Sequence, residues 1–523
     1  VLMKTRIPLL TTFIFLLFCS SGYSISNLAN YISYKHVNGN AYQVSLHVYR
    51  DCRGIGYNDS LLMKVEGDNN CFNAINFYVT RDTIINGTFE CSSGNSCNIQ
   101  NGVGNIGVEE QIYSATIDFD SAPYKVVLDS NCCDIYFVYS DCCRSGAVTT
   151  GITGSATNYA YLNRCYGKSN ISVNYNNKIA LNAYCNTTFE YSPFAIDADG
   201  DSLVFSLDSP LGSSRTNSIL FNTPLSPTIP ITPVCADLSV ACVPAFISGF
   251  YTGFDFDSIT NTIRLTPKKC TEVSTFVNRT DEYRKDTGGI WRLIGTTRRD
   301  QLIFISQLNN NIIPSLETKE AYYGCVGDSV NILFESKDKA PTGGFSDSTY
   351  ISWEHSVANA SLFINDVNAK NQKATLIWTP AKSDILKNDE YVHLLVTESN
   401  CSSNTSTSKS IVLYAVDSLK SDYRIIDRKN GTLFLDASIS GGSPRLANRI
   451  TWSIDTLSNF TTPITRTKEV DSIIRLEPGK YYVRLLVENT TNCDINIIDS
   501  IVIDPYFRFN FDGVPTKVCK QNN

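Results

Sequence analysis

Residues 196–207 read Ile196-Asp197-Ala198-Asp199-Gly200-Asp201-Ser202-Leu203-Val204-Phe205-Ser206-Leu207, an acidic turn that runs into a strand pattern. Asp197, Asp199 and Asp201 alternate, so their carboxylates can converge on one hard cation or cap one tight turn. After them, large apolar side chains occupy every second position, which is typical of a strand with one buried face. We therefore predict a β-sandwich strand that follows an acidic loop.

The composition of the 523-residue chain favours strands and loops over helices. Only 18 % of the residues are charged and only two are Met, whereas 28 are Tyr. Lys and Glu, which usually cover helix surfaces, are sparse. The net charge of -7 argues against a nucleic-acid partner, because binding phosphate requires a basic surface. A chain of this length is expected to form several domains of roughly 100–200 residues each.

Residues 1–24 have the pattern of a cleaved signal peptide. Lys4 and Arg6 precede an apolar run over residues 7–18, and Gly22 and Ser24 supply the small residues of a cleavage site. This run is too short to span a bilayer, and no other run predicts a transmembrane segment. All the cysteines except one lie after the leader, which indicates an oxidising compartment and disulfides. We therefore predict a secreted or extracellular cell-surface protein.

The second half of the chain contains an internal repeat. Ile351-Ser352-Trp353 recurs as Ile450-Thr451-Trp452, and Tyr391-Val392-His393-Leu394-Leu395-Val396 recurs as Tyr482-Val483-Arg484-Leu485-Leu486-Val487. The spacing of roughly 90–100 residues is the size of one immunoglobulin-like sandwich. The repeated Trp is expected to be a core residue of a central strand.

Several separated motifs resemble a known group of proteins. The acidic stretch resembles elements of bacterial cadherin-like extracellular domains. The turn at Tyr49-Arg50-Asp51-Cys52 and the strand ending in Cys142-Cys143-Arg144 resemble the N-terminal region of large secreted Bacteroidetes surface proteins, described as gliding-motility-associated or type IX-secreted. The resemblance continues through Glu282-Tyr283-Arg284 and residues 294–304. It implies cadherin-like and Ig/PKD-like β-sandwich modules but names no ligand.

The predicted fold is therefore all-β, with tandem antiparallel β-sandwiches that contain disulfides. The predicted divisions are a signal peptide (1–24), a Cys-rich N-terminal β domain (25–165), a cadherin-like sandwich (166–312), two Ig/PKD-like sandwiches (313–418 and 419–505) and the start of a further module (506–523), so the native chain is expected to be longer. Cys325 opens the first repeat unit and Cys401 lies near its end, so we expect these two to form a disulfide.

Two features predict ligands or modifications. The acidic loop supplies hard oxygen ligands suited to Ca²⁺ at Asp197, Asp199 and Asp201, although the spacing differs from that of an EF-hand. The alternative is a turn in which the aspartates accept backbone N–H groups. Asp-Ser or Asp-Thr followed by a small or branched residue also recurs, as at Asp59, Asp120 and Asp499. This triplet resembles the O-glycosylation acceptor of Bacteroidetes exported proteins, although Asp-Ser turns before strands would give the same pattern.

No catalytic motif is present in the sequence. The four His are scattered, and no zinc-protease, nucleophile-elbow or phosphate-loop pattern occurs. We predict a non-catalytic adhesin-like surface protein that binds a glycan or protein ligand through its β modules, and the resemblance implies an association with gliding. One alternative is a structural subunit of an extracellular filament or surface layer, which would self-associate. The other is an enzyme whose β modules are accessories to a catalytic part beyond this sequence.

Overall fold

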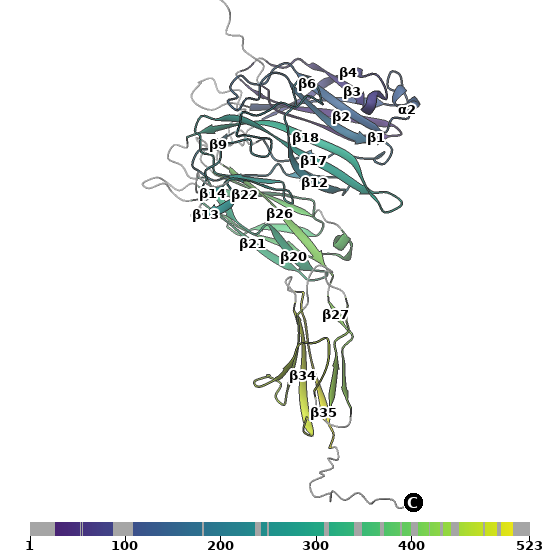
Figure 1. Cartoon of the computed structure of the whole chain (residues 1–523), viewed down its shortest axis with the longest axis vertical. Helices are drawn as coiled ribbons and strands as arrows, with labels where there is room; N and C mark the ends of the chain where they lie inside the picture. Colours follow the sequence, from purple (N-terminus) through teal and green to yellow (C-terminus); the bar gives the residue numbers. More distant parts are fainter. Residues whose placement is uncertain are drawn as a thin grey trace, which may run out of the picture.

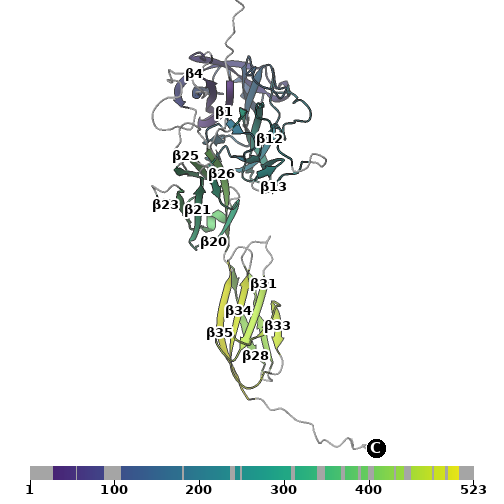
Figure 2. The same cartoon turned by 90° about the vertical axis from the view of Figure 1, so that its left-hand side faces the viewer.

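The computed structural model describes residues 27–505 except 53, 55, 87–107, 180–181, 236–241, 248–249, 308–312, 339–347, 367–370, 387–389, 399–405, 418, 429–431, 441–448, 474–475 and 489–492. The described part is almost entirely β-structure and forms three units along the long axis of the molecule (Figures 1 and 2). They are named here the head (residues 27–306), the middle sandwich (315–416) and the lower sandwich (420–503). The all-β fold class is confirmed, whereas the leader and residues 506–523 lie outside the described residues.

Eight strands of the head pair in a closed order. The order is β1-β2-β5-β4-β3-β6-β7-β18, and β18 pairs back onto β1 through Ala29↔Gln301 and Asn30↔Asp300. The strands are β1 (Asn27–Asn38), β2 (Ala41–Asp51), β3 (Ser60–Gly67), β4 (Ile75–Asn86), β5 (Val108–Asp118), β6 (Asp134–Asp141), β7 (Ala156–Asn163) and β18 (Trp291–Ser306). They enclose a buried core rich in aromatic residues, including Tyr34, Tyr42 and Phe137. Burial of these large side chains is the main stabilising term.

The same sheet continues beyond the closed ring. β18 pairs with β17 (Val273–Lys285), which pairs in turn with β12 (Ser202–Asp208). Residues of the predicted domains 25–165 and 166–312 therefore share one sheet, and the predicted boundary between them falls inside the head. β18 is 16 residues long, which lets it pair with β1, β7 and β17 along its length.

The strand predicted from the opening stretch is present as β12. Leu203 and Phe205 are buried, whereas Val204 between them is 49 % exposed. This confirms the alternation, and the buried face packs into a cluster that includes Tyr391 of the middle sandwich. The remaining head elements are β8 (Asn174–Tyr175), β9 (Asn182–Tyr184), β10 (Phe189–Tyr191), β11 (Ala195–Ile196), β13 (Ala245–Ile247), β14 (Phe250–Thr252), β15 (Phe254–Asp257), β16 (Thr262–Leu265), a 3-10 turn η1 (Asp68–Asn70) and the short helix α2 (Val126–Asp129).

The middle sandwich consists of two four-stranded sheets that face each other across one core. The first sheet has the order β19 (Ser315–Glu317), β21 (Val330–Lys337), β24 (Lys373–Trp378) and β23 (Ala360–Ile364), and the second has β20 (Ala321–Cys325), β26 (Ser406–Val416), β25 (Tyr391–Glu398) and β22 (Thr349–His355). A 3-10 turn, η3 (Lys382–Leu386), lies between β24 and β25. β20 runs parallel to β26, and the other pairs are antiparallel.

The lower sandwich has its own core and smaller sheets. Its strands are β27 (Lys420–Ser421) with β30 (Ile439–Ser440), then β28 (Arg424–Asp427), β29 (Leu433–Asp436) and β33 (Val470–Ile473), and last β32 (Ile464–Arg466), β31 (Arg449–Asp455), β34 (Gly479–Glu488) and β35 (Ile495–Ile503). The predicted repeat is visible in strand register. Trp353 lies opposite Leu394 in the middle sandwich, and Trp452 lies opposite Leu485 in the lower one. Trp452 is fully buried, but Trp353 is only half-buried.

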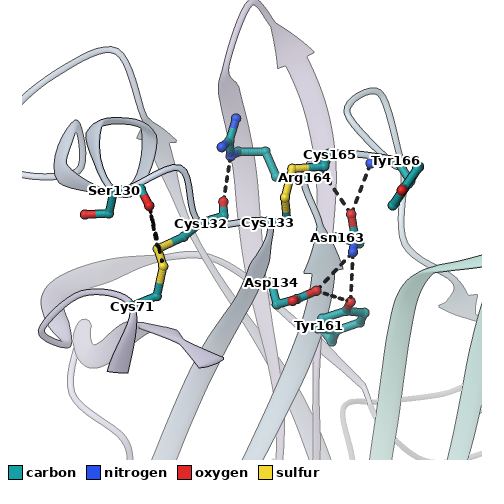
Figure 3. Close-up of a disulfide and its surroundings, with 10 residues drawn as sticks. All are labelled: Cys71, Ser130, Cys132, Cys133, Asp134, Tyr161, Asn163, Arg164, Cys165 and Tyr166. Carbon is teal, nitrogen blue, oxygen red and sulfur yellow. Dashed lines mark hydrogen bonds between the residues drawn. A yellow bond between two sulfur atoms is a disulfide. The ribbon is translucent and has the colours of Figure 1, made fainter. Parts of the chain in front are cut away.

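Disulfides link segments of the head, as expected for a protein of an oxidising compartment. Figure 3 shows that the adjacent residues Cys132 and Cys133 bond in different directions, to Cys71 and Cys165 respectively. Two further bonds link Cys185 to Cys270 and Cys235 to Cys242. Two cysteines that are adjacent in the sequence therefore need not bond to each other.

One disulfide differs from the prediction. Cys325 bonds to Cys493, and the Cα atoms are 5.5 Å apart. This corrects the expected pairing with Cys401, which itself lies outside the described residues. Cys325 ends β20 of the middle sandwich, and Cys493 precedes β35 of the lower sandwich, so the bond joins two modules. The prediction assumed that the first of the two sandwiches closes its own disulfide, whereas the structure places Cys325 beside Cys493 of the next sandwich.

Within the described residues, no helix is long and apolar enough to cross a bilayer.

Candidate functional site

The acidic loop connects β11 to β12 and is organised by its own backbone. Asp197 Oδ1 accepts hydrogen bonds from the backbone N–H groups of Asp199 and Asp201, both at 2.9 Å. Gly200 has a φ of +75°, a conformation that glycine adopts at no steric cost. Asp197 therefore caps a tight turn, which was one of the two structures predicted for this stretch.

Arg284, at the end of β17, pairs with the other two carboxylates. Its Nε and Nη2 atoms lie 2.6 Å from the two carboxylate oxygens of Asp201, and Nη2 is 3.0 Å from Asp199 Oδ2. The hydrogen bonds to Asp201 are the largest cause that raises the pKa of Arg284 above its usual value. The guanidinium is thus held by a bidentate pair, the strongest geometry for such a contact.

Two of the three aspartates, Asp199 and Asp201, share Arg284 as their partner. Asp197 Oδ1 accepts backbone N–H groups, and a cation would have to displace Arg284 to reach Asp199 and Asp201. Among the residues that the structure describes, no group of three His, Cys, Asp or Glu side chains is arranged to hold a metal ion. The binding of Ca²⁺ at Asp197, Asp199 and Asp201 stays a prediction.

Glu282, two residues before Arg284, is fully buried beneath the loop. It accepts hydrogen bonds from the backbone N–H of Val173 at 2.7 Å and from Asn170 Nδ2 at 3.1 Å. Burial, and then the nearby Asp197 carboxylate, raise the pKa of Glu282 well above its usual range. Gly295 lies opposite it in β18, where an added Cβ would come within 1.7 Å of Glu282 Oε2. The buried acid therefore requires glycine at position 295.

A cleft of about 710 Å³ opens beside this loop, between the head and the middle sandwich; it is named here the junction cleft. The head contributes the acidic loop, the end of the β17–β18 hairpin and Trp291. The middle sandwich contributes Ser356, Glu390 and Tyr391. Trp291 is 48 % exposed, and Lys285 Nζ lies 4.9 Å from its ring centroid. The cleft therefore combines an aromatic surface with carboxylates and a cation, the mixture typical of polar ligand sites.

The two walls of the junction cleft are locked together by a buried interface. The ring of His393 lies 4.7 Å from that of Phe194, and His393 Nδ1 is 2.8 Å from Ser410 Oγ. Ser192, two residues before Phe194, donates its backbone N–H to Ser408 Oγ at 2.9 Å. These contacts hold β25 and β26 against the head, so the cleft is preformed.

Ion pairs span the same interface. Arg264 on β16 lies 3.1 Å from Glu320, and Lys409 on β26 lies 3.3 Å from Glu190 of β10. Arg264 and Lys409 are themselves almost fully buried. Arg264 also pairs with Glu190 and Asp255 inside the head, whereas separating the units would take the buried Lys409 away from Glu190. The Lys409–Glu190 pair therefore makes the interface resist opening.

A hydrogen-bonded series of Ser, His and Glu side chains crosses strands β1, β2 and β5 of the head. Ser33 Oγ is 3.3 Å from His47 Nε2, and His47 Nδ1 is 2.8 Å from Glu110 Oε1. This order matches the nucleophile, base and orienting acid of a hydrolase. However, the His47 ring stacks on Tyr31 at 4.1 Å, and the three strands are paired residue by residue. Their backbone amides serve the sheet rather than a developing oxyanion, so we interpret the series as a cross-strand polar network.

Sequence reasoning found part of this site. It placed Asp197, Asp199 and Asp201 in one loop, and it singled out the segment containing Glu282 and Arg284 without assigning either a role. The spacing of these charges along a strand was a usable signal, because residues two apart face the same side. Trp291, Glu390 and Tyr391 had no comparable signal, since they meet only when two units pack.

Comparisons with known proteins give little. No protein-family model matches the chain, and no curated protein matches it. A crystal structure of titin domains matches with a TM-score of 0.24 and 10 % identity, over 64 % of this chain and 97 % of that one. The mouse nectin-like molecule 4 ectodomain matches at TM-score 0.17 and 14 % identity, over 63 % and 99 %. A sialic acid-binding region of a Streptococcus sanguinis adhesin matches with a TM-score of 0.18 and 9 % identity, over 51 % of this chain and 95 % of that one. These scores are too low for any inference.

Proposed function

We propose that this chain is an exported, non-catalytic surface protein of adhesin type, which binds its ligand in the junction cleft. One observation carries the proposal: a preformed cleft of about 710 Å³ with the half-exposed Trp291 at its rim. A large aromatic side chain left exposed beside hydrogen-bonding groups is a common anchor for protein and sugar ligands.

The rest of the molecule is suited to display this cleft. Disulfides in the head and between the two sandwiches favour an extracellular location, where thiols stay oxidised. The head lies at one end of a row of units, and the lower sandwich lies at the other end (Figure 2). The Cys142-Cys143-Arg144 resemblance supports a Bacteroidetes surface protein associated with gliding or type IX secretion.

The chemistry of the cleft favours a glycan over a protein ligand. Tyr391 is almost fully buried in the cleft wall and Tyr283 is partly buried, so Trp291 is the most exposed aromatic side chain of the cleft. The flat ring suits the apolar face of a sugar, and the aspartates and Ser356 suit its hydroxyl groups. A cleft of about 710 Å³ has the size of a small-ligand pocket, whereas stable protein complexes bury roughly 800 Å² per partner.

The test is a binding screen of the full chain on an array of neutral and acidic oligosaccharides. Trp291→Ala is expected to weaken binding of any retained glycan by more than about tenfold, the loss typical of a central aromatic anchor. Phe246→Ala is the matched control, because Phe246 on β13 is 63 % exposed and lies outside the cleft. Equal binding by both variants, or no glycan bound by the wild type, would refute the assignment.

A further inference from the structure

Two adjacent cysteines of the head have no disulfide partner. Cys142 and Cys143 follow β6 directly, and both are exposed and unbonded. Every other cysteine that the structure describes is disulfide-bonded: Cys52, Cys71, Cys132, Cys133, Cys165, Cys185, Cys235, Cys242, Cys270, Cys325 and Cys493. A free, exposed thiol pair in an otherwise oxidised protein requires a chemical explanation.

The residue before the pair is firmly anchored. Asp141 is buried, and its Oδ2 accepts hydrogen bonds from the Tyr57 hydroxyl at 2.7 Å and from Asn27 Nδ2 at 3.2 Å. Its Oδ1 accepts the backbone N–H of Cys142 at 2.7 Å. The backbone entering the thiol pair is therefore fixed in place.

The residue after the pair is anchored equally well. The buried guanidinium of Arg144 donates to Asp300 Oδ1 on β18 at 3.0 Å, and the Arg144 backbone N–H donates to Gly154 O at 2.7 Å. Between these anchors, the Cys143 thiol is the largest cause that raises the pKa of its neighbour Cys142. Two free thiols on adjacent residues react with each other in preference to sulfurs on other molecules, because the second step is intramolecular.

The other adjacent pair of the head behaves differently. Cys132 and Cys133 diverge to partners on opposite sides, as Figure 3 shows. In the described part of the chain, Cys142 and Cys143 are the free cysteines. Their side chains are also exposed to solvent, so small oxidants and reductants have access to them.

We propose that the thiols of Cys142 and Cys143 form a redox-active pair that closes reversibly into a vicinal disulfide. The oxidant is a small-molecule disulfide such as glutathione disulfide. One cysteine thiolate attacks it, forms a mixed disulfide and releases one glutathione thiolate, which takes up a proton. The neighbouring cysteine then loses its proton, attacks the protein sulfur and expels the second glutathione. Two cysteine thiols are thus oxidised, and one glutathione disulfide is reduced to two thiols.

The position of the pair is expected to make this disulfide easy to reverse. A bond between neighbouring residues closes a small ring through their shared peptide bond, and exposed or strained disulfides are the labile ones. The hydrogen bond to Cys143, and then burial, raise the pKa of Cys142 to about 11. Thiolate is the attacking form, so ring closure through Cys142 is expected to be slow at neutral pH and to accelerate as the pH rises.

Peptide mass spectrometry tests this directly. The full chain is incubated with glutathione disulfide, quenched in acid, alkylated with N-ethylmaleimide and cleaved before Asp and after Arg, which releases residues 141–144. The expected peptide lacks both alkyl groups and is lighter than the dithiol by two hydrogen atoms. Mild dithiothreitol should restore alkylation at Cys142 and Cys143 while the Cys71–Cys132 and Cys185–Cys270 bonds remain closed.

Variants make the result decisive. Cys143→Ser is expected to accumulate a glutathione adduct on Cys142 that the wild type does not retain, because the resolving thiol is missing. The double change Cys142→Ser/Cys143→Ser should show neither adduct nor mass loss. Persistent alkylation of the oxidised wild type, lasting glutathione adducts on it, or a bond from either cysteine to any other cysteine would overturn the proposal.

Discussion

Acidification should loosen the interface that supports the junction cleft, through His393. This side chain lies on β25 and is 2 % exposed. Its ring stacks between Phe194 and Tyr391, and Nδ1 contacts Ser410 Oγ at 2.8 Å. Burial is the largest cause that lowers the pKa of His393, from 6.5 to about 3; a backbone hydrogen bond to Ala195 opposes it. Protonation would place a charge where neither stacked ring can neutralise it.

The direction of the effect follows from linkage. The unfolded chain takes up a proton on His393 near pH 6.5, whereas the folded chain takes it up only near pH 3. The contribution is therefore complete above pH 6.5 and is lost as the pH falls toward 3. At about 1.36 kcal/mol per pH unit, the loss reaches about 5 kcal/mol in total and about 3 kcal/mol by pH 4.5.

The assay compares urea unfolding of the wild type and His393→Gln between pH 7 and pH 4.5. Gln cannot titrate. Over this range, the free energy of unfolding of the variant should therefore fall by about 3 kcal/mol less than that of the wild type, whatever the stability of the variant at pH 7. Other titrating groups, such as the buried Glu282, cancel in the difference. His36→Gln is the control, because His36 lies on β1 away from this interface. Parallel pH profiles for the wild type and His393→Gln would refute the reasoning.

Three further predictions concern the head. Gly295→Ala should destabilise the folded chain by about 3 kcal/mol or more in chemical denaturation, because its Cβ would lie 1.7 Å from Glu282 Oε2; an unchanged midpoint would contradict this packing. If Ca²⁺ binds the loop, the melting temperature should rise in millimolar CaCl₂ and rise further in Arg284→Gln, which frees two carboxylates; no shift in either protein would exclude the metal. A fluorophosphonate probe should leave Ser33 unmodified, because a non-catalytic serine is not activated as a nucleophile. An adduct on Ser33 that is absent in His47→Gln would show a hydrolase and contradict a non-catalytic role.

Local sequence patterns were enough to predict that the fold is built from β-strands. Alternation at Leu203 and Phe205 gave a strand with one buried face, and the recurrence of Trp452 marked a core position. Both inferences need only neighbouring residues, because side chains alternate across a strand whatever the strand pairs with. The turn-capping role of Asp197 is local in the same way, since its hydrogen bonds reach residues two and four positions ahead.

Long-range pairing could not be predicted in this way. Arg284 reaches Asp201 across 83 positions, and β18 closes the head by returning to β1. Cys325 bonds across 168 positions to a different module. No local pattern distinguishes one such partner from another, because many partners satisfy the same alternation and the choice depends on how whole strands pack.

By itself, the sequence determined that this is an all-β, cysteine-rich chain with an acidic turn before β12, because residue type and spacing act over a few positions. Only the tertiary structure decided that residues 27–306 form one unit, that Arg284 pairs with two carboxylates of the loop and that Trp291 faces a cleft shared with the middle sandwich. Those features arise when distant segments bury a common surface, and the free energy of that burial belongs to the assembled fold rather than to any one segment.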